Sequence, residues 1–305
     1  MSIPFDQRHV NLVKRAEVID AIRCFFKGLG YLEVETPIRT REIIPEAHID
    51  PVASGNWYLQ ASPELCMKRM LGSGCGPIFQ ICKVFRQEER GERHLPELTL
   101  LEWYTPDSTY LDIMNQIRDM VRYVAGKLQC KGKLPYQGQV IDLDADWERL
   151  TVQQAFKSIA SRDVDETLED GSYDEVMAFD IEPALGNRVP CFLYDYPASQ
   201  ASLARLKPGS RTIAQRMEFY IAGLELANGF TELTDPHEQM SRFKGEIQHR
   251  QQLGKPVAGM PEKFLNDLEH MPPASGVAFG IDRLVMLFCN ASTIDDVVSF
   301  TPEML

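Results

Sequence analysis

The chain has 305 residues, of which 44% are hydrophobic and 25% charged, so it can bury a sizeable core. Its formal charge of −12 argues against a broad nucleic-acid surface, because phosphate binding needs clustered lysine and arginine. No apolar run is long enough to span a membrane, and the start, MSIPFDQRHV, lacks the apolar core of a signal peptide. We therefore expect a cytoplasmic protein that does not bind membranes.

The cysteines are seven in number, which is odd, and no two of them have C-x-x-C spacing. Most stand in apolar stretches such as FQICKVF. We expect reduced core residues rather than metal ligands or a redox pair. They are Cys24, Cys66, Cys75, Cys82, Cys130, Cys191 and Cys289.

The first part of the chain predicts two helices and two short strands. From Val10 to Leu29, apolar residues recur at steps of three and four, which is typical of an amphipathic helix. YLEVETP then indicates a strand that ends at Pro37, and WYLQ indicates another. In SPELCMKRML, Ser62 is the expected helix cap and Pro63 the first helical position.

A short charged stretch separates two β-rich runs. FRQEERGERHLPE, Phe85 to Glu97, contains three arginines, four glutamates and a histidine. PIFQICKVF precedes it and LTLLEWY follows it. The pattern predicts a hairpin whose long loop, with the adjoining strand ends, carries the charges.

The remaining segments predict one α+β domain, residues 1–305. The segment from about 126 to 190 has the weakest pattern, and we expect connecting helices and a helical insertion there. Strands return from Arg216, a helix opens at DPHEQMSRF, and SGVAFGIDRLVMLF reads as strand, turn and helix. Neither an internal repeat nor a Pro/Gly/Ser linker divides the chain.

Glu102 interrupts an apolar stripe in the predicted strand ELTLLEWY. Because side chains on a strand alternate faces, Glu102 shares one face with Leu98, Leu100 and Tyr104. A buried carboxylate needs a partner, since an unpaired buried charge is very costly. The alternative is an edge strand on which Glu102 faces water.

Two further glutamates, Glu218 and Glu225, lie in MEFYIAGLELANGFTEL and converge if Ala222-Gly223-Leu224 forms a turn. Converging carboxylates are natural Mg²⁺ ligands when a polyphosphate supplies the other oxygens. Downstream, one strand face carries an amide, an aromatic ring and a carboxylate suited to a small cationic ligand, at Asn228, Phe230 and Glu232. A surface hairpin without a ligand pocket is the alternative.

After ELTLLEWY and MEFYIAGLELANGFTEL, a third stretch suggests a binding site. This stretch, GVAFGIDRLVM, carries glycines at 276 and 280 and places Arg283 in the first turn of a helix. A cation beside helix amide donors is suited to phosphate. By itself the pattern is also typical of a strand-to-helix turn with a surface arginine.

Together and in this order, the stretches resemble the three signature motifs of class II aminoacyl-tRNA synthetases. GYLEVETPI is similar to motif 1, VFRQEE with RHLPELTLLEWY to motif 2, and GVAFGIDRL to motif 3. The resemblance implies an α+β catalytic core whose mixed, mostly antiparallel sheet is flanked by helices. It also implies a homodimer, since motif 1 helices usually form a two-fold interface.

Within that class the chain resembles the lysyl branch, through SPELCMKR, YPASQASLA and ELANGFTELTDP. The chain begins shortly before the motif 1 helix, so we expect no anticodon-binding domain. A freestanding lysyl-like core resembles the ligases that attach (R)-β-lysine to translation elongation factor P. Ser62 and Ala278 support this branch, because they replace an alanine and a glycine of the synthetases at the pocket wall.

The resemblance also implies an ATP site. Arg86 binds the α-phosphate, and Glu88 faces the adenine amino group. Arg93 and His94 reach the γ-phosphate, and Arg283 completes the clamp. Arg86 and Arg283 are then the catalytic residues, because they stabilise the charge that develops at the α-phosphate.

The same resemblance implies that Glu218 and Glu225 hold Mg²⁺. It also implies a pocket for a diamino acid, whose two ammonium groups explain why acidic residues dominate the wall. The positions that match the family's substrate-binding residues are Glu64, Glu102, Tyr104, Asn228, Phe230 and Glu232, and Ser62 and Ala278 complete the wall.

Two residues depart from the family pattern. Leu98 stands where a phenylalanine would stack on adenine, and Leu95 stands where an asparagine is expected. Leucine covers a base by apolar contact but loses aromatic stacking. Two other functions remain as alternatives: charging of tRNA, which the charge of −12 disfavours, and an inactive regulatory paralogue.

Overall fold

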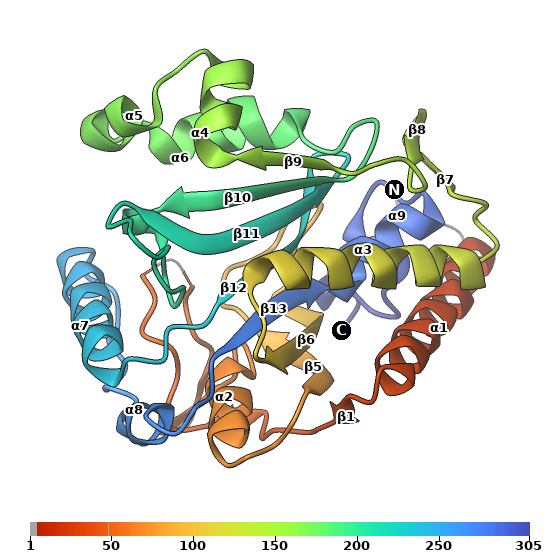
Figure 1. Ribbon diagram of the computed structural model, residues 1–305. Coiled ribbons are helices and arrows are strands. Elements are labelled where there is room, and N and C mark those ends of the chain that lie inside the picture. The colour runs from red at the N-terminus through yellow and green to blue at the C-terminus, as the bar shows by residue number, and fades with distance from the viewer. Residues whose placement is uncertain (1–4, 48) are drawn as a thin grey trace.

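A mixed, mostly antiparallel sheet of eight strands forms the centre of the molecule, as the motifs predicted (Figure 1). The computed structural model describes residues 5–47 and 49–305. Only the end strands pair in parallel, β1 with β5 and β9 with β10. In sheet order the strands are β1 Leu32–Glu33, β5 Ile78–Phe85, β6 Glu97–Pro106, β13 Ala274–Gly280, β12 Leu224–Thr231, β11 Ile213–Ile221, β10 Cys191–Pro197 and β9 Glu148–Thr151.

Helices cover both faces of the sheet (Figure 1). One face, with Leu101, Trp103 and Phe279, packs against α1 Phe5–Gly28, α3 Tyr110–Lys127 and α9 Ile281–Cys289. The other face, with Tyr104, packs against α2 Glu64–Gly72, α7 Pro236–Gln252 and α8 Glu262–Leu268. Among the described helices, none is both long and apolar enough to cross a membrane.

The residues between β9 and β10 form a layer of their own against β10 (Figure 1). Before them, the hairpin β7 Lys133–Tyr136 and β8 Gln139–Asp142 packs beside α9, and β9 joins the edge of the main sheet. These strands were not anticipated from the sequence. Short helical pieces follow: α4 Val152–Ala155, η1 Phe156–Ala160, α5 Val164–Asp170, α6 Tyr173–Val176, η2 Met177–Ile181 and η3 Glu182–Ala184.

Small elements complete the fold outside the main sheet. A second sheet consists of β2 Arg39–Thr40, β4 Trp57–Leu59 and β3 Ala53–Ser54, in that order. Single turns of helix occur at η4 Ala198–Gln200, η5 Ile294–Val297 and η6 Pro302–Met304.

Local sequence signals hold for most of the elements around the site. The charged stretch joins β5 to β6, which pair in antiparallel fashion from Ile78↔Tyr104 to Phe85↔Glu97. The start of α2 differs by one position, because the helix begins at Glu64 and Pro63 is its cap. Ser62 still satisfies the first turn, since its Oγ accepts a hydrogen bond from the Glu64 amide at 2.9 Å.

The prediction that the cysteines are core residues holds fully for one of them and partly for three that pack at the edge of the core. All seven are free thiols, but only Cys191 is buried. Cys24 lies exposed on α1, and the other five are partly exposed. Apolar neighbours in sequence did not reveal burial here, because successive side chains point in different directions both on a helix, as at Cys24, and on a strand, as at Cys82.

Candidate active site

A cavity of about 260 Å³ lies where distant parts of the chain meet. Its wall combines the segment 44–49, the start of α2, the β5–β6 loop, strands β6, β12 and β13, and the first turn of α9. Most of the predicted site residues line it: Ser62, Glu64, Arg86, Arg93, His94, Leu98, Glu102, Tyr104, Glu225, Asn228, Phe230, Ala278 and Arg283. The predicted guanidinium groups and carboxylates therefore share one space.

Three predicted residues, Glu88, Glu218 and Glu232, do not line the cavity. Glu88 is exposed in the β5–β6 loop with a left-handed φ of 65°, and the next residue, Glu89, lines the wall instead. Glu218 and Glu232 are buried behind the wall. Glu218 forms an ion pair with Arg216, and Glu232 forms one with Lys68.

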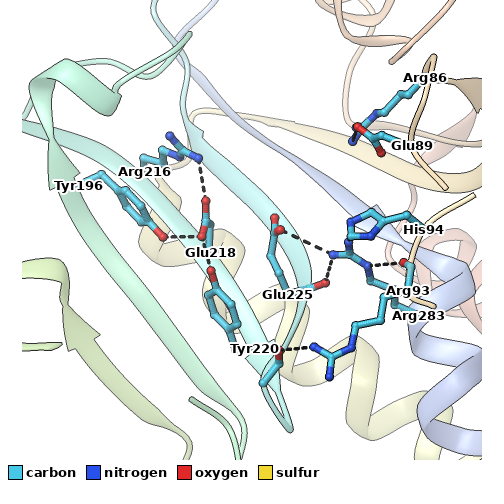
Figure 2. A network of polar contacts seen from close by, with 11 residues as sticks. Arg86, Glu89, Arg93, His94, Tyr196, Arg216, Glu218, Tyr220, Glu225 and Arg283 are labelled. Atoms are coloured by element: carbon cyan, nitrogen blue, oxygen red, sulfur yellow. Dashed lines mark hydrogen bonds and ion pairs between the residues drawn. The ribbon is translucent and has the colours of Figure 1, made fainter. Parts of the chain in front are cut away.

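Cationic side chains gather at one end of the cavity (Figure 2). Arg283 donates from Nη1 to the Glu225 carbonyl at 2.5 Å, and its Nη2 lies 2.5 Å from His94 Nε2. Burial and the Arg283 charge lower the pKa of His94, which favours a neutral imidazole that accepts this hydrogen bond. Arg93 reaches the Gly223 carbonyl at 3.5 Å, so the β5–β6 loop meets the β11–β12 turn.

Arg86 joins this group from the end of β5. Its Nη1 lies 3.7 Å from Glu89 Oε1 (Figure 2). Its Nε is buried and has no hydrogen-bond partner among the described residues. An unsatisfied buried donor at a cavity wall is suited to an anionic ligand such as a phosphate.

The β11–β12 hairpin brings the predicted carboxylate pair to one face. Ala222 and Gly223, at φ 53° and 67°, form its two-residue turn, as predicted, although Leu224 already belongs to β12. In the register that results, Glu225 pairs with Tyr220 and so shares the face of Glu218. The pKa of Glu225 is raised by burial and by the Glu218 charge.

A β-bulge in β12 brings Asn228, which was predicted to bind the substrate, to the same face. Glu225 pairs with Tyr220 while Ala227 pairs with Phe219, so Leu226 is the extra residue. The bulge shifts the alternation by one position and places Asn228 opposite Glu218. Without it, Asn228 would point to the other side of the sheet.

Glu218 and Glu225 differ in how they are held (Figure 2). Glu218 accepts hydrogen bonds from Arg216 at 2.7 Å and from the Tyr196 and Tyr220 hydroxyls at 2.5 Å each. The one ion pair of the Glu225 carboxylate with the described residues is to Arg283, at 3.6 Å. Within the described residues no three metal-binding side chains converge, so a cation at this pair would need oxygens from a ligand.

Glu102 has the buried position that its strand predicted. It is 1% exposed and accepts hydrogen bonds from Ser62 Oγ at 2.6 Å and from the Tyr104 hydroxyl at 3.1 Å. Burial, together with the nearby Glu64 charge, raises the pKa of Glu102 to about 8. The edge-strand alternative is therefore excluded, since β6 lies between β5 and β13.

Lys68 is a site component that sequence analysis missed. Its side chain is 1% exposed and its Nζ lies 2.5 Å from both Glu64 Oε1 and Glu232 Oε2. Burial opposes its charge, but Glu232 and Glu64 together raise the pKa of Lys68. It also lies over the Phe230 ring, 5.0 Å from the centroid. The i,i+4 spacing of Glu64 and Lys68 on α2 was the available signal.

The β13 wall requires a small residue at one position. A Cβ added to Gly276 would lie 2.3 Å from Tyr104 Cε1 and 2.4 Å from Glu232 Oε1. Ala278, two residues on, lines the cavity and pairs across the sheet with Glu102 and Asn228. The alanine therefore lies between two residues predicted to bind the substrate.

Two other polar residues at the site were not predicted. Glu46 lines the cavity from the connection between β2 and β3, which carries no motif. Arg216 binds Glu218 and also donates to the Gln200 carbonyl at 2.5 Å. Its position two residues before Glu218 on β11 was the available signal, because residues i and i+2 share a strand face.

Comparison with known proteins places the whole chain among synthetase-like enzymes. The family model of tRNA synthetases class II (D, K and N) matches residues 3–304. The elongation factor P–(R)-β-lysine ligase of Edwardsiella ictaluri is 40% identical over 312 residues, covering 96% of this chain and 95% of the relative. The proteins of the same name from Salmonella gallinarum and Klebsiella pneumoniae are 39% and 40% identical, with the same coverage.

Proposed function

Because the chain belongs to the class II aminoacyl-tRNA synthetase family and, within it, to the elongation factor P–(R)-β-lysine ligases, we propose that it joins (R)-β-lysine to a lysine of elongation factor P at the expense of ATP. The observation that carries the proposal is one cavity in which guanidinium groups adjoin buried carboxylates. A reaction of this kind between soluble components of translation would take place in the cytoplasm.

The cationic end of the cavity supports an ATP site. In the proposal Arg86 and Arg283 bind the phosphate that is attacked, and Arg93 and His94 bind the outer phosphate. The unsatisfied Nε of Arg86 supports this role. Leu98 covers the adenine by apolar contact from the wall. The role of Glu88 stays a prediction that the exposed side chain in this structure does not favour.

Glu218 and Glu225 are the proposed holders of Mg²⁺, and their oxygen donors fit this hard cation. Glu225 has the more open carboxylate and is the proposed direct ligand. Glu218 is oriented by Arg216 and two tyrosine hydroxyls and supports the pair from behind the wall. The cation, when bound, would neutralise phosphate charge.

The carboxylate end of the cavity is the proposed diamino acid pocket. Glu64, Glu102 and Glu232 bring three negative charges when ionised, and Lys68 brings one positive charge. The two negative charges that Lys68 does not neutralise match the two ammonium groups of (R)-β-lysine. Tyr104 orients Glu102, and the substrate's amines compete with buried partners rather than with bulk water. In the proposal Ser62, Asn228, Phe230 and Ala278 shape the remaining wall.

The chemistry needs positioning and charge stabilisation rather than a protein nucleophile. In the first step a carboxylate oxygen of the amino acid attacks the α-phosphorus of ATP, and pyrophosphate leaves. Arg86 and Arg283 stabilise the added negative charge. In the second step the ε-amine of the acceptor lysine attacks the carbonyl of the adenylate, and AMP leaves with the amide formed.

The test is incubation of the protein with ATP, one lysine isomer and purified elongation factor P, followed by intact-mass measurement of the acceptor. We expect a mass increase of one lysyl residue with the β-isomer. Transfer of labelled amino acid to tRNA instead would favour the tRNA-charging alternative. Absence of ATP–pyrophosphate exchange would favour an inactive paralogue, which the assembled arginines and carboxylates disfavour.

We further propose a homodimer formed through the α1 side of the molecule. Val10 and Val13 on this helix are 53% and 47% exposed, so α1 presents apolar side chains to the surroundings. Burial of such side chains in a two-fold interface would stabilise a dimer. Light scattering coupled to size-exclusion chromatography measures the mass directly, and a monomer at micromolar concentration would contradict this part of the proposal.

A further inference from the structure

Glu46 is a carboxylate of the cavity wall for which the proposed chemistry has no role so far. It belongs to the segment 44–49, whose Ile44 and Ile49 line the same cavity. The segment lies between β2 and β3 of the second sheet, and the start of α2 lines the same cavity. Glu46 thus approaches the reacting groups from a part of the chain outside the three signature motifs.

Glu46 differs from the other acidic residues of the wall in having a free carboxylate. In the described residues, no hydrogen bond or ion pair holds its side chain. Every other wall carboxylate has a partner: Glu64 has Lys68, Glu89 has Arg86, Glu102 has Ser62 and Tyr104, Glu225 has Arg283, and Asp282 has Arg15. A carboxylate that is not engaged can accept a proton from a ligand.

The backbone around Glu46, in contrast, is firmly held. Arg250, which is 3% exposed, donates from Nη1 to the Glu46 carbonyl at 2.7 Å and to the Ile49 carbonyl at 3.0 Å. The Ala47 amide donates to Glu246 Oε2 at 2.9 Å. The C-terminal half of α7 therefore positions Glu46 and leaves its carboxylate available.

Charged groups from both halves of the cavity lie close enough to Glu46 to act on it. Arg86, the proposed α-phosphate ligand, and Glu64, of the proposed amine pocket, act most strongly on it. The other charged groups that face it are Arg216 on β11 and Glu246 on α7. Burial raises the pKa of Glu46, with Arg86 opposing the rise, and a raised pKa strengthens a carboxylate as a base.

We propose that Glu46 is the general base of the transfer step and takes a proton from the ε-ammonium group of the acceptor lysine. This inference rests on the proposed function. The adenylate carbonyl must form where the amino-acid carboxylate meets the α-phosphate, so an incoming amine passes the wall between Arg86 and Glu64. Glu46 is the free acceptor on that wall.

The protons and electrons balance as follows. The acceptor ammonium gives one proton to the Glu46 carboxylate, and the freed nitrogen lone pair forms the C–N bond with the adenylate carbonyl carbon. The bond between that carbon and the phosphate oxygen breaks, and AMP keeps the electron pair. The nitrogen loses a second proton to water as the amide forms, and Glu46 later returns its own proton to water.

The test compares wild type, Glu46→Gln and a control, Glu42→Gln, in three assays. Glu42 lies just before this segment and outside the cavity, and it accepts a hydrogen bond from the Lys263 amide at 3.3 Å. The assays are ATP–pyrophosphate exchange, capture of the adenylate by hydroxylamine, and transfer to elongation factor P. Hydroxylamine is a neutral nucleophile and needs no base to remove a proton before it attacks.

We expect transfer to elongation factor P by Glu46→Gln to fall about 100-fold or more, the usual range for a lost general base. Exchange and hydroxamate formation should fall far less, and Glu42→Gln should resemble wild type in all three assays. Equal losses in all three by Glu46→Gln would assign a structural role and overturn the proposal, as would wild-type transfer. If the wild-type protein itself forms the adenylate but modifies no acceptor, the proposed function fails first.

Discussion

The two halves of the cavity are held together in opposite ways. In the amino-acid half, which is the half proposed to bind the diamino acid, Glu102, Glu232 and Lys68 are nearly inaccessible and bind one another or neighbouring hydroxyls at short distances. In the nucleotide half, which is the half proposed to bind ATP, Arg93 and His94 are exposed, and their contacts are to a loop carbonyl and to Arg283. One half is rigid before the ligand arrives, whereas the other is open to it.

This difference matches the chemistry that each half is proposed to perform. A small diamino acid offers few atoms for recognition, so selectivity requires carboxylates held in fixed positions. A ligand that lacks a matching ammonium group leaves such a buried carboxylate unpaired, which is costly. A triphosphate brings much charge of its own and can order flexible arginines as it binds. Variants should therefore affect protein stability in the first half and catalysis in the second.

The largest expected effect on stability comes from Lys68→Met. The change leaves Glu64 and Glu232 buried without their cation, which typically costs about 3–5 kcal/mol. Lys133→Met is the matched control, because its ion pair with Asp142 lies at the surface, where solvent screens it, and should contribute far less. Urea denaturation at neutral pH measures both, and equal losses would show that the amino-acid half is not specially rigid.

In the nucleotide half, Arg86→Ala should affect catalysis and leave the fold intact. Loss of one charge-stabilising group typically lowers a rate about 10²–10³-fold. The control from the same loop is Arg90→Ala, since Arg90 pairs with Asp295 and Glu303 outside the cavity. ATP–pyrophosphate exchange measures the first step, and unchanged exchange in Arg86→Ala would refute the proposed phosphate contact.

Much of the fold was predictable because its signals are local. The alternation in ELTLLEWY correctly placed Glu102 and Tyr104 on one strand face, which lines the cavity, and one glycine correctly marked the turn that brings Glu225 to the face of Glu218. Arg283 at the start of α9 followed from the glycine-flanked turn before it. Each inference needed only the period of a strand or the chemistry of a turn.

What could not be predicted depends on contacts between distant segments. The bulge at Leu226 turns Asn228 toward the cavity. No glycine or other marker in the sequence identifies that residue as the site of a bulge. Glu46 reaches the cavity because Arg250, far along the chain, holds its carbonyl. In the sequence, Lys68 looks like an ordinary surface lysine of a helix. Its role depends on Glu232, a residue far along the chain that the fold brings beside it.

A pH series on Glu102→Gln tests how the rigid half recognises a cation. Because the pKa of Glu102 is about 8 in the free protein, it is mostly protonated at neutral pH and must release its proton to bind an ammonium group. Affinity for the diamino acid should therefore rise between pH 6 and about 8 in wild type. Glu102→Gln should bind about 10- to 100-fold more weakly, the effect of losing a hydrogen bond to a charge, and lose much of that rise.

Stability should respond to pH in the opposite direction. The folded pKa of Glu102 exceeds its unfolded value of about 4.3, so its contribution is fully present below that value and is lost as pH rises through about 8. Glu232, whose pKa burial also raises to about 8, should preserve part of the dependence in Glu102→Gln. Denaturant titrations at pH 6 and pH 9 measure the difference, and a flat profile in wild type would contradict the raised pKa.

The smallest expected effect concerns Leu98, whose partly exposed side chain lines the nucleotide half of the cavity. Leu98→Phe would restore an aromatic surface for the adenine, and an aromatic contact adds about 0.5–1.5 kcal/mol beyond apolar burial. The KM for ATP should fall by at most about tenfold, and the KM for the amino acid should not change. Leu98→Ala, which removes the cover, should raise the KM for ATP. An open site accommodates the larger ring, so a loss of ATP affinity in Leu98→Phe would indicate that the nucleotide half is as tightly packed as the amino-acid half.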